Sequence, residues 1–154
     1  MYSKQEASQL RQDFWTIFGK YMSPVFSSEG EKINWINYKT GVKGIGFSMH
    51  ADNKAAEIGI DITHKDTGIQ ELYFEQFRQF QKLLEDELQE KWKWQLHVPD
   101  ANSRTISRIY TQKNSVSIFQ KEHWPELISF FKPRIIAMDR FWNQVKYGFE
   151  DLGS

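Results

Sequence analysis

Hydrophobic residues recur every three or four positions near the start of the chain, a spacing typical of an amphipathic α-helix. The stripe consists of Ala7, Leu10, Phe14, Ile17 and Tyr21. Ser3 and Glu6 have the spacing of a capping box, in which a hydroxyl and a carboxylate satisfy backbone N–H groups at the start of a helix. The sequence therefore predicts a helix that begins after Ser3 and ends before Pro24.

Between residues 31 and 64 the hydrophobic period changes to the alternation of β-strands. The pattern predicts three strands, at residues 33–38, 44–50 and 56–63, with turns at 39–41 and 52–53. Such short strands joined by tight turns indicate an antiparallel meander.

The third of these strands has the clearest alternation, because three isoleucines share one of its faces: Ile58, Ile60 and Ile62. We expect this face to pack against three residues of the helix that follows: Phe77, Phe80 and Leu84. Glu57 and Asp61 then lie on the outer face, and a slip of one residue would exchange the two faces.

The rest of the chain predicts a long helix, two strands and two helices. The expected elements are a helix at 66–90, strands at 92–98 and 104–111, a helix from 124 that Pro133 ends or kinks, and a last helix at 135–149. The order is α-β-β-β-α-β-β-α-α. We therefore expect an α+β fold in a single domain of residues 1–154, with a twisted, mainly antiparallel sheet of about five strands. The first and the long helices would cover its apolar face.

Composition narrows the classes of function. The numbers of basic and acidic residues are equal, at 20 each, so the chain lacks the global field of a strong nucleic-acid or membrane binder. Cysteine is absent, which excludes disulfides, thiolate metal sites and cysteine nucleophiles. The polar start does not resemble a signal peptide, and no apolar run approaches the ~20 residues of a membrane span. We expect a cytoplasmic protein without a cofactor or a membrane partner.

Two acids are the candidate catalytic residues. The opening order α-β-β-β-α-β is that of the restriction-endonuclease-like core, in which an acid and an acid-x-Lys triplet hold a divalent metal ion. Glu57 and Asp61 lie on a fitting strand, but Gly59 stands where the lysine is needed. A cluster of His50 and His64 with Asp61 would require folding to assemble it. We therefore predict no metal site and no metal-dependent DNA cleavage, and we favour a protein that is not an enzyme.

The candidate binding residues are four bases of the predicted hairpin: Lys91, Lys93, Arg104 and Arg108. Segment 91–121 has an excess of five bases, and the preceding helix, 66–90, has an excess of five acids. The bases could contact the phosphates of DNA or RNA, with Trp92, Trp94 and Tyr110 as stacking surfaces. They could instead pair with the acids at 85–87 and 90 of the same chain, or with another copy of the protein.

Several stretches rich in aromatic residues carry a resemblance to a known family. They are Phe14-Trp15 with Tyr21-Met22, WINYKTG at 35–41, SRIY at 107–110, WPELI at 124–128, and Phe141-Trp142 with KYGFE at 146–150. Over essentially its whole length the chain resembles a bacterial family of unknown function, numbered four-two-six-eight among the domains of unknown function. The resemblance implies a small bacterial protein and supplies no catalytic residues. Related domains can lie at the end of longer chains that look like restriction or defence proteins.

Three functions from different classes follow from these observations. The leading hypothesis is a non-enzymatic binding or assembly module that forms a homo-oligomer. The second is a nucleic-acid-associated accessory of restriction or defence, and the third is a diverged restriction-endonuclease-like domain without the full metal-binding triplet. The sequence names no small-molecule ligand.

Overall fold

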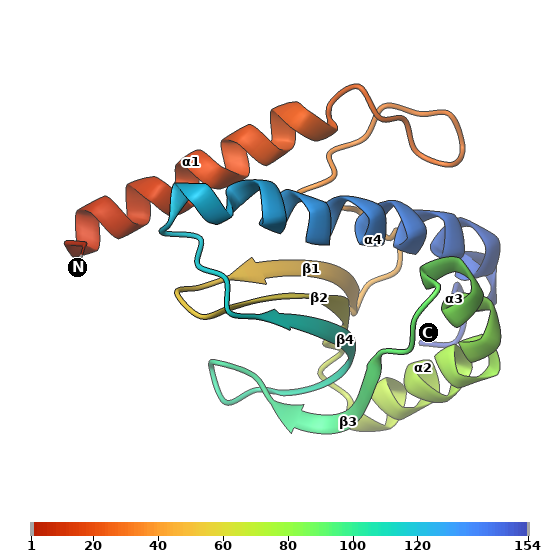
Figure 1. Cartoon of the computed structure of the whole chain (residues 1–154). Helices are drawn as coiled ribbons and strands as arrows, with labels where there is room; N and C mark the ends of the chain where they lie inside the picture. The colour runs from red at the N-terminus through yellow and green to blue at the C-terminus, as the bar shows by residue number, and fades with distance from the viewer. Residues whose placement is uncertain (1, 154) are drawn as a thin grey trace.

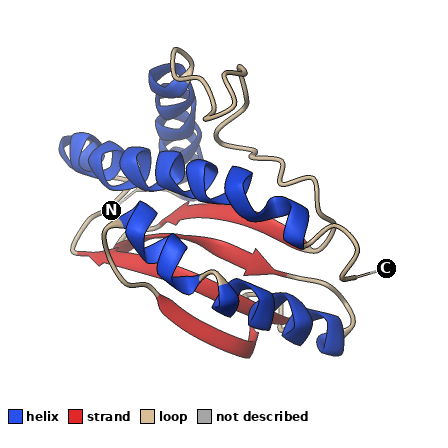
Figure 2. Ribbon diagram, turned by 90° about the vertical axis from the view of Figure 1, so that its right-hand side faces the viewer, coloured by secondary structure: helices blue, strands red, loops and turns tan. Residues whose placement is uncertain are grey.

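A computed structural model describes residues 2–153 and shows an α+β fold built on one antiparallel sheet (Figure 1). The elements are α1 (Lys4–Met22), β1 (Ile45–Ala51), β2 (Ala55–Ile62), α2 (Thr67–Gln79), α3 (Gln81–Leu88), β3 (Lys93–Pro99), β4 (Thr105–Asn114) and α4 (Trp124–Val145), with 3-10 helices η1 (Lys121–His123) and η2 (Lys146–Gly148) on either side of α4. The strand order is β1-β2-β4-β3. Figure 2 shows the four strands together from the side.

Helix α1 begins where the sequence predicts it. The hydroxyl of Ser3 accepts from the N–H of Glu6, and the carboxylate of Glu6 accepts from the N–H of Ser3, which confirms the capping box. Phe14 and Phe18 are fully buried. However, α1 packs on α4, on the side of α4 that faces away from the sheet (Figure 1). The prediction that α1 covers the sheet is therefore wrong, and α4 lies over the sheet together with α2.

The isoleucine face of β2 is buried as predicted. Ile58, Ile60 and Ile62 have no exposed surface, and they belong to the same core as Phe77 and Leu84. Phe80 is partly buried at the margin of this core. The alternate side chains of β2 lie on the opposite, outer face of the sheet.

The predicted strand at 33–38 is not formed, so the sheet has four strands rather than about five. Residues 23–44 contain neither helix nor strand. The side chain of Asn34 accepts from the N–H groups of Ile36 and Asn37, and this Asx turn curls the chain. Trp35 and Tyr38 make the stretch resemble a strand. In the structure the indole of Trp35 instead donates to the carbonyl of Val25 in the same segment, and the hydroxyl of Tyr38 donates to Asp139 of α4.

Two predicted helices in the second half of the chain end elsewhere in the structure: the helix expected at 66–90 and the helix expected from 124 to Pro133. The long helix begins after the N-cap Asp66 as expected, but it breaks at Phe80 into α2 and α3. Pro133 does not end a helix, since α4 runs through it. Proline has no backbone N–H, so the carbonyl of Ser129 lacks its helical donor. Ser129 and Pro133 are both exposed, so water can hydrogen-bond to that carbonyl. Packing of the buried residues on both sides of Pro133 keeps α4 continuous.

Candidate functional site

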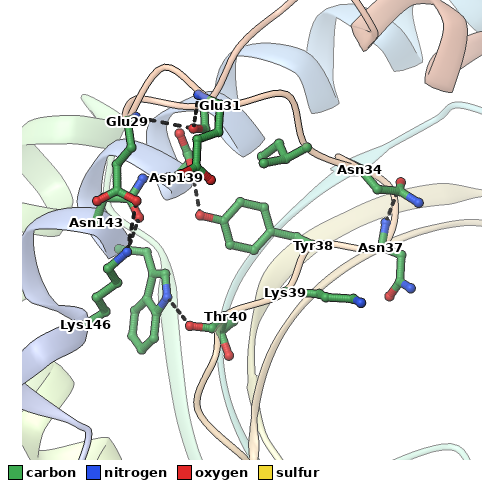
Figure 3. A pocket seen from close by; sticks show the side chains of 13 residues that line it. Glu29, Glu31, Asn34, Asn37, Tyr38, Lys39, Thr40, Asp139, Asn143 and Lys146 are labelled. Carbon is green, nitrogen blue, oxygen red and sulfur yellow. Dashed lines mark hydrogen bonds and ion pairs between the residues drawn. The ribbon is translucent and has the colours of Figure 1, made fainter.

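A pocket of about 470 Å³ lies between the irregular segment 23–44 and the C-terminal half of α4 (Figure 3). Its charged lining residues are Glu29, Glu31, Lys39, Asp139 and Lys146. Two aromatic rings, Tyr38 and Trp142, form part of its wall. The pocket therefore combines a mainly charged and polar lining with two flat aromatic surfaces.

Asp139 is the central residue of this pocket and is 1% exposed. Its Oδ1 accepts from the hydroxyl of Tyr38 at 2.6 Å and from the amide of Asn143 at 3.1 Å. Its Oδ2 accepts from the N–H of Ser28 at 2.7 Å. Two of these three donors belong to the segment 23–44, so the buried carboxylate ties that segment to α4.

Tyr38 is held as a hydrogen-bond donor. Burial, together with the hydrogen bond to Asp139, raises the pKa of the Tyr38 hydroxyl far above its usual value. The hydroxyl therefore keeps its proton at physiological pH. The Tyr38 ring stacks on Phe47 at a centroid distance of 4.6 Å, and the indole of Trp142 donates to the carbonyl of Thr40 at 2.8 Å. These contacts hold the aromatic wall in place.

Lys146 and Glu29 form an ion pair at the rim, with Nζ 3.0 Å from Oε1. The Lys146 ammonium also donates to the side-chain oxygen of Asn143. Burial alone would lower the pKa of Lys146, but the hydrogen bond and charge of Glu29 outweigh it, so the pKa is raised. Lys146 is thus a stable cation whose charge is matched by Glu29.

Glu31 differs from the other two pocket acids. Within residues 2–153 no side chain or backbone group hydrogen-bonds to its carboxylate, and it forms no ion pair. Figure 3 shows Glu29 and Glu31 on the side of the pocket where Asp139 and Lys146 lie, whereas Lys39 lies on the other side of the Tyr38 ring. One end of the pocket is therefore acidic. The Glu31 carboxylate there is exposed and in no ion pair with a described residue, and its charge acts at longer range on Lys146, whose pKa it helps to raise.

The two candidate catalytic acids lie away from this pocket, on the outer face of the sheet. Asp61 pairs in register with Arg108, one of the four candidate binding bases. The Arg108 guanidinium contacts Glu57 at 2.8 Å and Asp61 at 3.3 Å. Burial would lower the pKa of Arg108, but the two carboxylates outweigh it and raise the pKa. The fold thus joins a predicted binding residue to both predicted catalytic acids, and neither acid is free.

The other three candidate bases, Lys91, Lys93 and Arg104, are exposed and form no ion pair with a described residue. Two of the aromatic residues proposed as stacking surfaces already contact other parts of the protein. Trp92 is buried with its indole donating to Glu90, and the ring of Trp94 packs edge-on against Phe74.

Within the described residues, the acids at 85–87 and 90 form no ion pair with the bases of the hairpin. Glu90 is bound by Arg134 at 2.8 Å, and Glu87 by Arg140 at 2.9 Å, and both arginines belong to α4. The sequence leaves open a pairing of Arg104 and Arg108 with these acids. In the structure Arg108 instead pairs with Glu57 and Asp61, and Arg104 forms no ion pair with a described residue.

The histidines do not assemble with Asp61. The ring of His64 accepts from the N–H of Asp66, and His50 is exposed on β1. Across the described range 2–153, no three His, Asp or Glu side chains are grouped so that they could hold a metal ion.

Sequence reasoning missed the pocket. The sequence pattern predicts the end of a strand and a turn at residues 37–40, whereas these residues line the pocket. One signal is available in the sequence, because Asp139 directly follows the apolar run 135–138 and lies two residues before Phe141 in α4. A carboxylate on an apolar helix face needs buried donors, so it marks a polar contact inside the fold.

The fold and the pocket define an α+β protein in which α4 packs on one face of the sheet. The buried carboxylate of Asp139 on α4 hydrogen-bonds to the irregular segment 23–44. The chain belongs to the family described as Domain of unknown function (DUF4268), whose sequence model matches residues 10–146. No curated protein and no solved structure matches the chain. No helix within residues 2–153 is long and apolar enough to cross a membrane. Part of the stretch 35–41 that carries the family resemblance lines the pocket, as do Trp142 and Lys146.

Proposed function

We propose that the protein is a binding module whose pocket between segment 23–44 and α4 takes a positively charged group of a small molecule. The observation that carries this proposal is the unpaired carboxylate of Glu31 beside the aromatic wall. An ammonium or amidinium group placed there would meet an opposite charge and the faces of aromatic rings, and both attract cations.

The charges of the pocket favour a cation over an anion. Lys146 is matched by Glu29, and Asp139 is satisfied by three neutral donors, so neither leaves a net positive charge at the acidic end. An anion there would be repelled by Glu31 and by Asp139. Lys39 lies beyond the Tyr38 ring, where it could contact a polar or anionic tail of the same ligand.

Matched fragment pairs test this proposal, with benzamidine against benzamide and benzylamine against benzyl alcohol. We expect the cations to raise the melting temperature with increasing concentration and the neutral analogues to leave it unchanged, because only a ligand that binds the folded state stabilises it. Glu31→Gln should abolish the shift at little cost in stability, since the Glu31 carboxylate has no partner to lose.

Glu122→Gln is the matched control, because Glu122 is an exposed acid in η1 and does not line the pocket. It should leave the response to the cations intact. Equal binding of cationic and neutral fragments, or full binding by Glu31→Gln, would contradict the proposal.

Nucleic-acid association is the second candidate function, and it rests on Lys93 and Arg104. Both are exposed, and the Lys93 ammonium lies 6.0 Å from the ring centre of Tyr110. If this surface binds phosphates, the double variant Lys93→Glu/Arg104→Glu should abolish a gel shift that weakens steeply with salt, without lowering the melting temperature. A shift that survives this variant would exclude the hairpin as the binding surface.

Arg108→Glu gives a contrasting expectation. It removes the bridge between Glu57 and Asp61 and places a third carboxylate beside them, so it should lower the free energy of unfolding by about 2 kcal/mol. Urea denaturation of Arg108→Glu and of Arg104→Glu measures the free energy of unfolding of each variant. Equal destabilisation by Arg104→Glu alone would show that the two arginines have the same role.

A further inference from the structure

The two edges of the sheet are built differently. The edge strand β3 has an irregular register between Gln95 and Val98, a residue with positive φ at His97, a lysine at its start and a proline at its end. Bulges, lysine and proline are the features by which proteins prevent an edge strand from pairing with another chain. The β3 edge is therefore protected.

The opposite edge strand, β1, has none of these features. All seven of its residues pair with β2 in an unbroken register, and the strand, IGFSMHA, contains no lysine, arginine, acid or proline. Its only ionisable side chain is that of His50. An uncharged and regular edge strand of this kind is a template for a further strand.

The hydrogen-bond pattern shows which backbone groups of β1 point away from β2. The N–H of Thr63 donates to the carbonyl of Gly44, so even-numbered residues of β1 share hydrogen bonds with β2, and odd-numbered residues point outward. At Ile45 the outward N–H donates to Val42, and the outward carbonyl accepts from the hydroxyl of Thr40.

The next two outward positions are Phe47 and Met49. No described residue hydrogen-bonds to their outward N–H and carbonyl groups. Both side chains lie against the margin of the core and are partly exposed, and Ser48 between them is also partly exposed. Two unused backbone positions and two apolar side chains thus lie along the same edge.

We propose that β1 pairs antiparallel with β1 of a second copy of the chain, about a twofold axis at Ser48, so that the two sheets become one. Phe47 then lies opposite Met49 of the second copy, and each such pair exchanges two hydrogen bonds, about four in total. The same pairing brings a phenylalanine against a methionine, a favourable contact of sulfur with an aromatic ring.

The occupant is a second copy because this edge is self-complementary. Antiparallel pairing about Ser48 matches apolar with apolar on the inner face and serine with serine on the outer face, and it places no like charges opposite each other. The same register leaves His50 opposite Gly46 of the second copy, where there is room for the imidazole, because no atom lies within 4 Å of a Cβ built on Gly46.

Variants of Met49 test the pairing by light scattering and sedimentation velocity over a range of concentrations. The wild type should be a dimer, and Met49→Lys should be a monomer with an unchanged circular dichroism spectrum. Met49→Pro should also be a monomer, because Met49 does not share hydrogen bonds with β2 and the proline removes only an outward N–H. Gln112→Lys is the control, since it adds the same charge on an exposed position of β4, two strands from the edge.

Cysteine crosslinking tests the register itself, and the chain contains no native cysteine. Ser48→Cys places two thiols opposite each other in a non-hydrogen-bonded pair, where the side chains are closest, so oxidation should give a covalent dimer. His50→Cys should not crosslink, because it lies opposite glycine. A wild type that stays monomeric at all concentrations, a dimer that persists in Met49→Lys, or equal crosslinking by both cysteine variants would overturn the proposal.

Discussion

Asp139→Ala is expected to lower the free energy of unfolding by about 3–4 kcal/mol, which corresponds to a fall in melting temperature of roughly 10 °C. The Asp139 carboxylate is 1% exposed and accepts three hydrogen bonds. Its removal leaves the half-buried hydroxyl of Tyr38 and the N–H of Ser28 without their acceptor, and an unpaired donor that is shielded from water carries a cost of desolvation.

The loss should be concentrated in one region, because Asp139 holds segment 23–44 and makes no contact of this kind with the sheet. Hydrogen exchange should accelerate within residues 25–40 well before it changes in β2 and β4. Asp86→Ala provides a control, since Asp86 is an exposed acid of α3. A loss below about 1 kcal/mol, or an equal rise in exchange across the whole protein, would argue against this role of Asp139.

Gly59→Ala is the second change with a large expected effect. A Cβ at this position would lie 2.7 Å from the Cβ of Tyr110 and 2.8 Å from the carbonyl oxygen of Ile109, closer than real Cβ contacts allow. The neighbouring atoms belong to the central strand β4, which cannot move without disturbing the sheet. We expect destabilisation of about 2–3 kcal/mol by chemical denaturation.

Gly46→Ala is the matched control, because Gly46 lies in the adjacent strand and no atom lies within 4 Å of its added Cβ. It should be neutral or stabilising by up to about 1 kcal/mol, since alanine reduces the freedom of the unfolded chain. Similar effects of the two changes would mean that crowding by Tyr110 is unimportant.

The crowding at Gly59 also explains the incomplete metal-binding triplet. A lysine at position 59 would complete an acid-x-Lys pattern with Glu57, but its Cβ would collide with Tyr110 in the same way. Arg108, from the neighbouring strand, supplies the positive charge beside Glu57 and Asp61 instead. The outer face of the sheet is thus arranged around an ion-pair cluster.

The sequence alone determines the features that depend on neighbouring residues. The capping box places the start of α1, and Asp66 places the start of α2, because a cap bonds to N–H groups within three residues of it. The strict alternation in β2 sets which face is buried. Successive side chains of a strand point to opposite faces, so Ile58, Ile60 and Ile62 share the apolar face.

Only the tertiary structure decides the features that depend on distant residues. Tyr38 belongs to a stretch with strand-like composition, but its hydroxyl bonds to Asp139, 101 residues away, and this contact outweighs local propensity. Arg108 bridges Glu57 and Asp61, which lie 51 and 47 residues from it, because β2 and β4 are neighbours in the sheet. A hydrophobic pattern records which residues are buried, whereas the partner of a buried polar group is set by the packing of elements that the pattern does not connect.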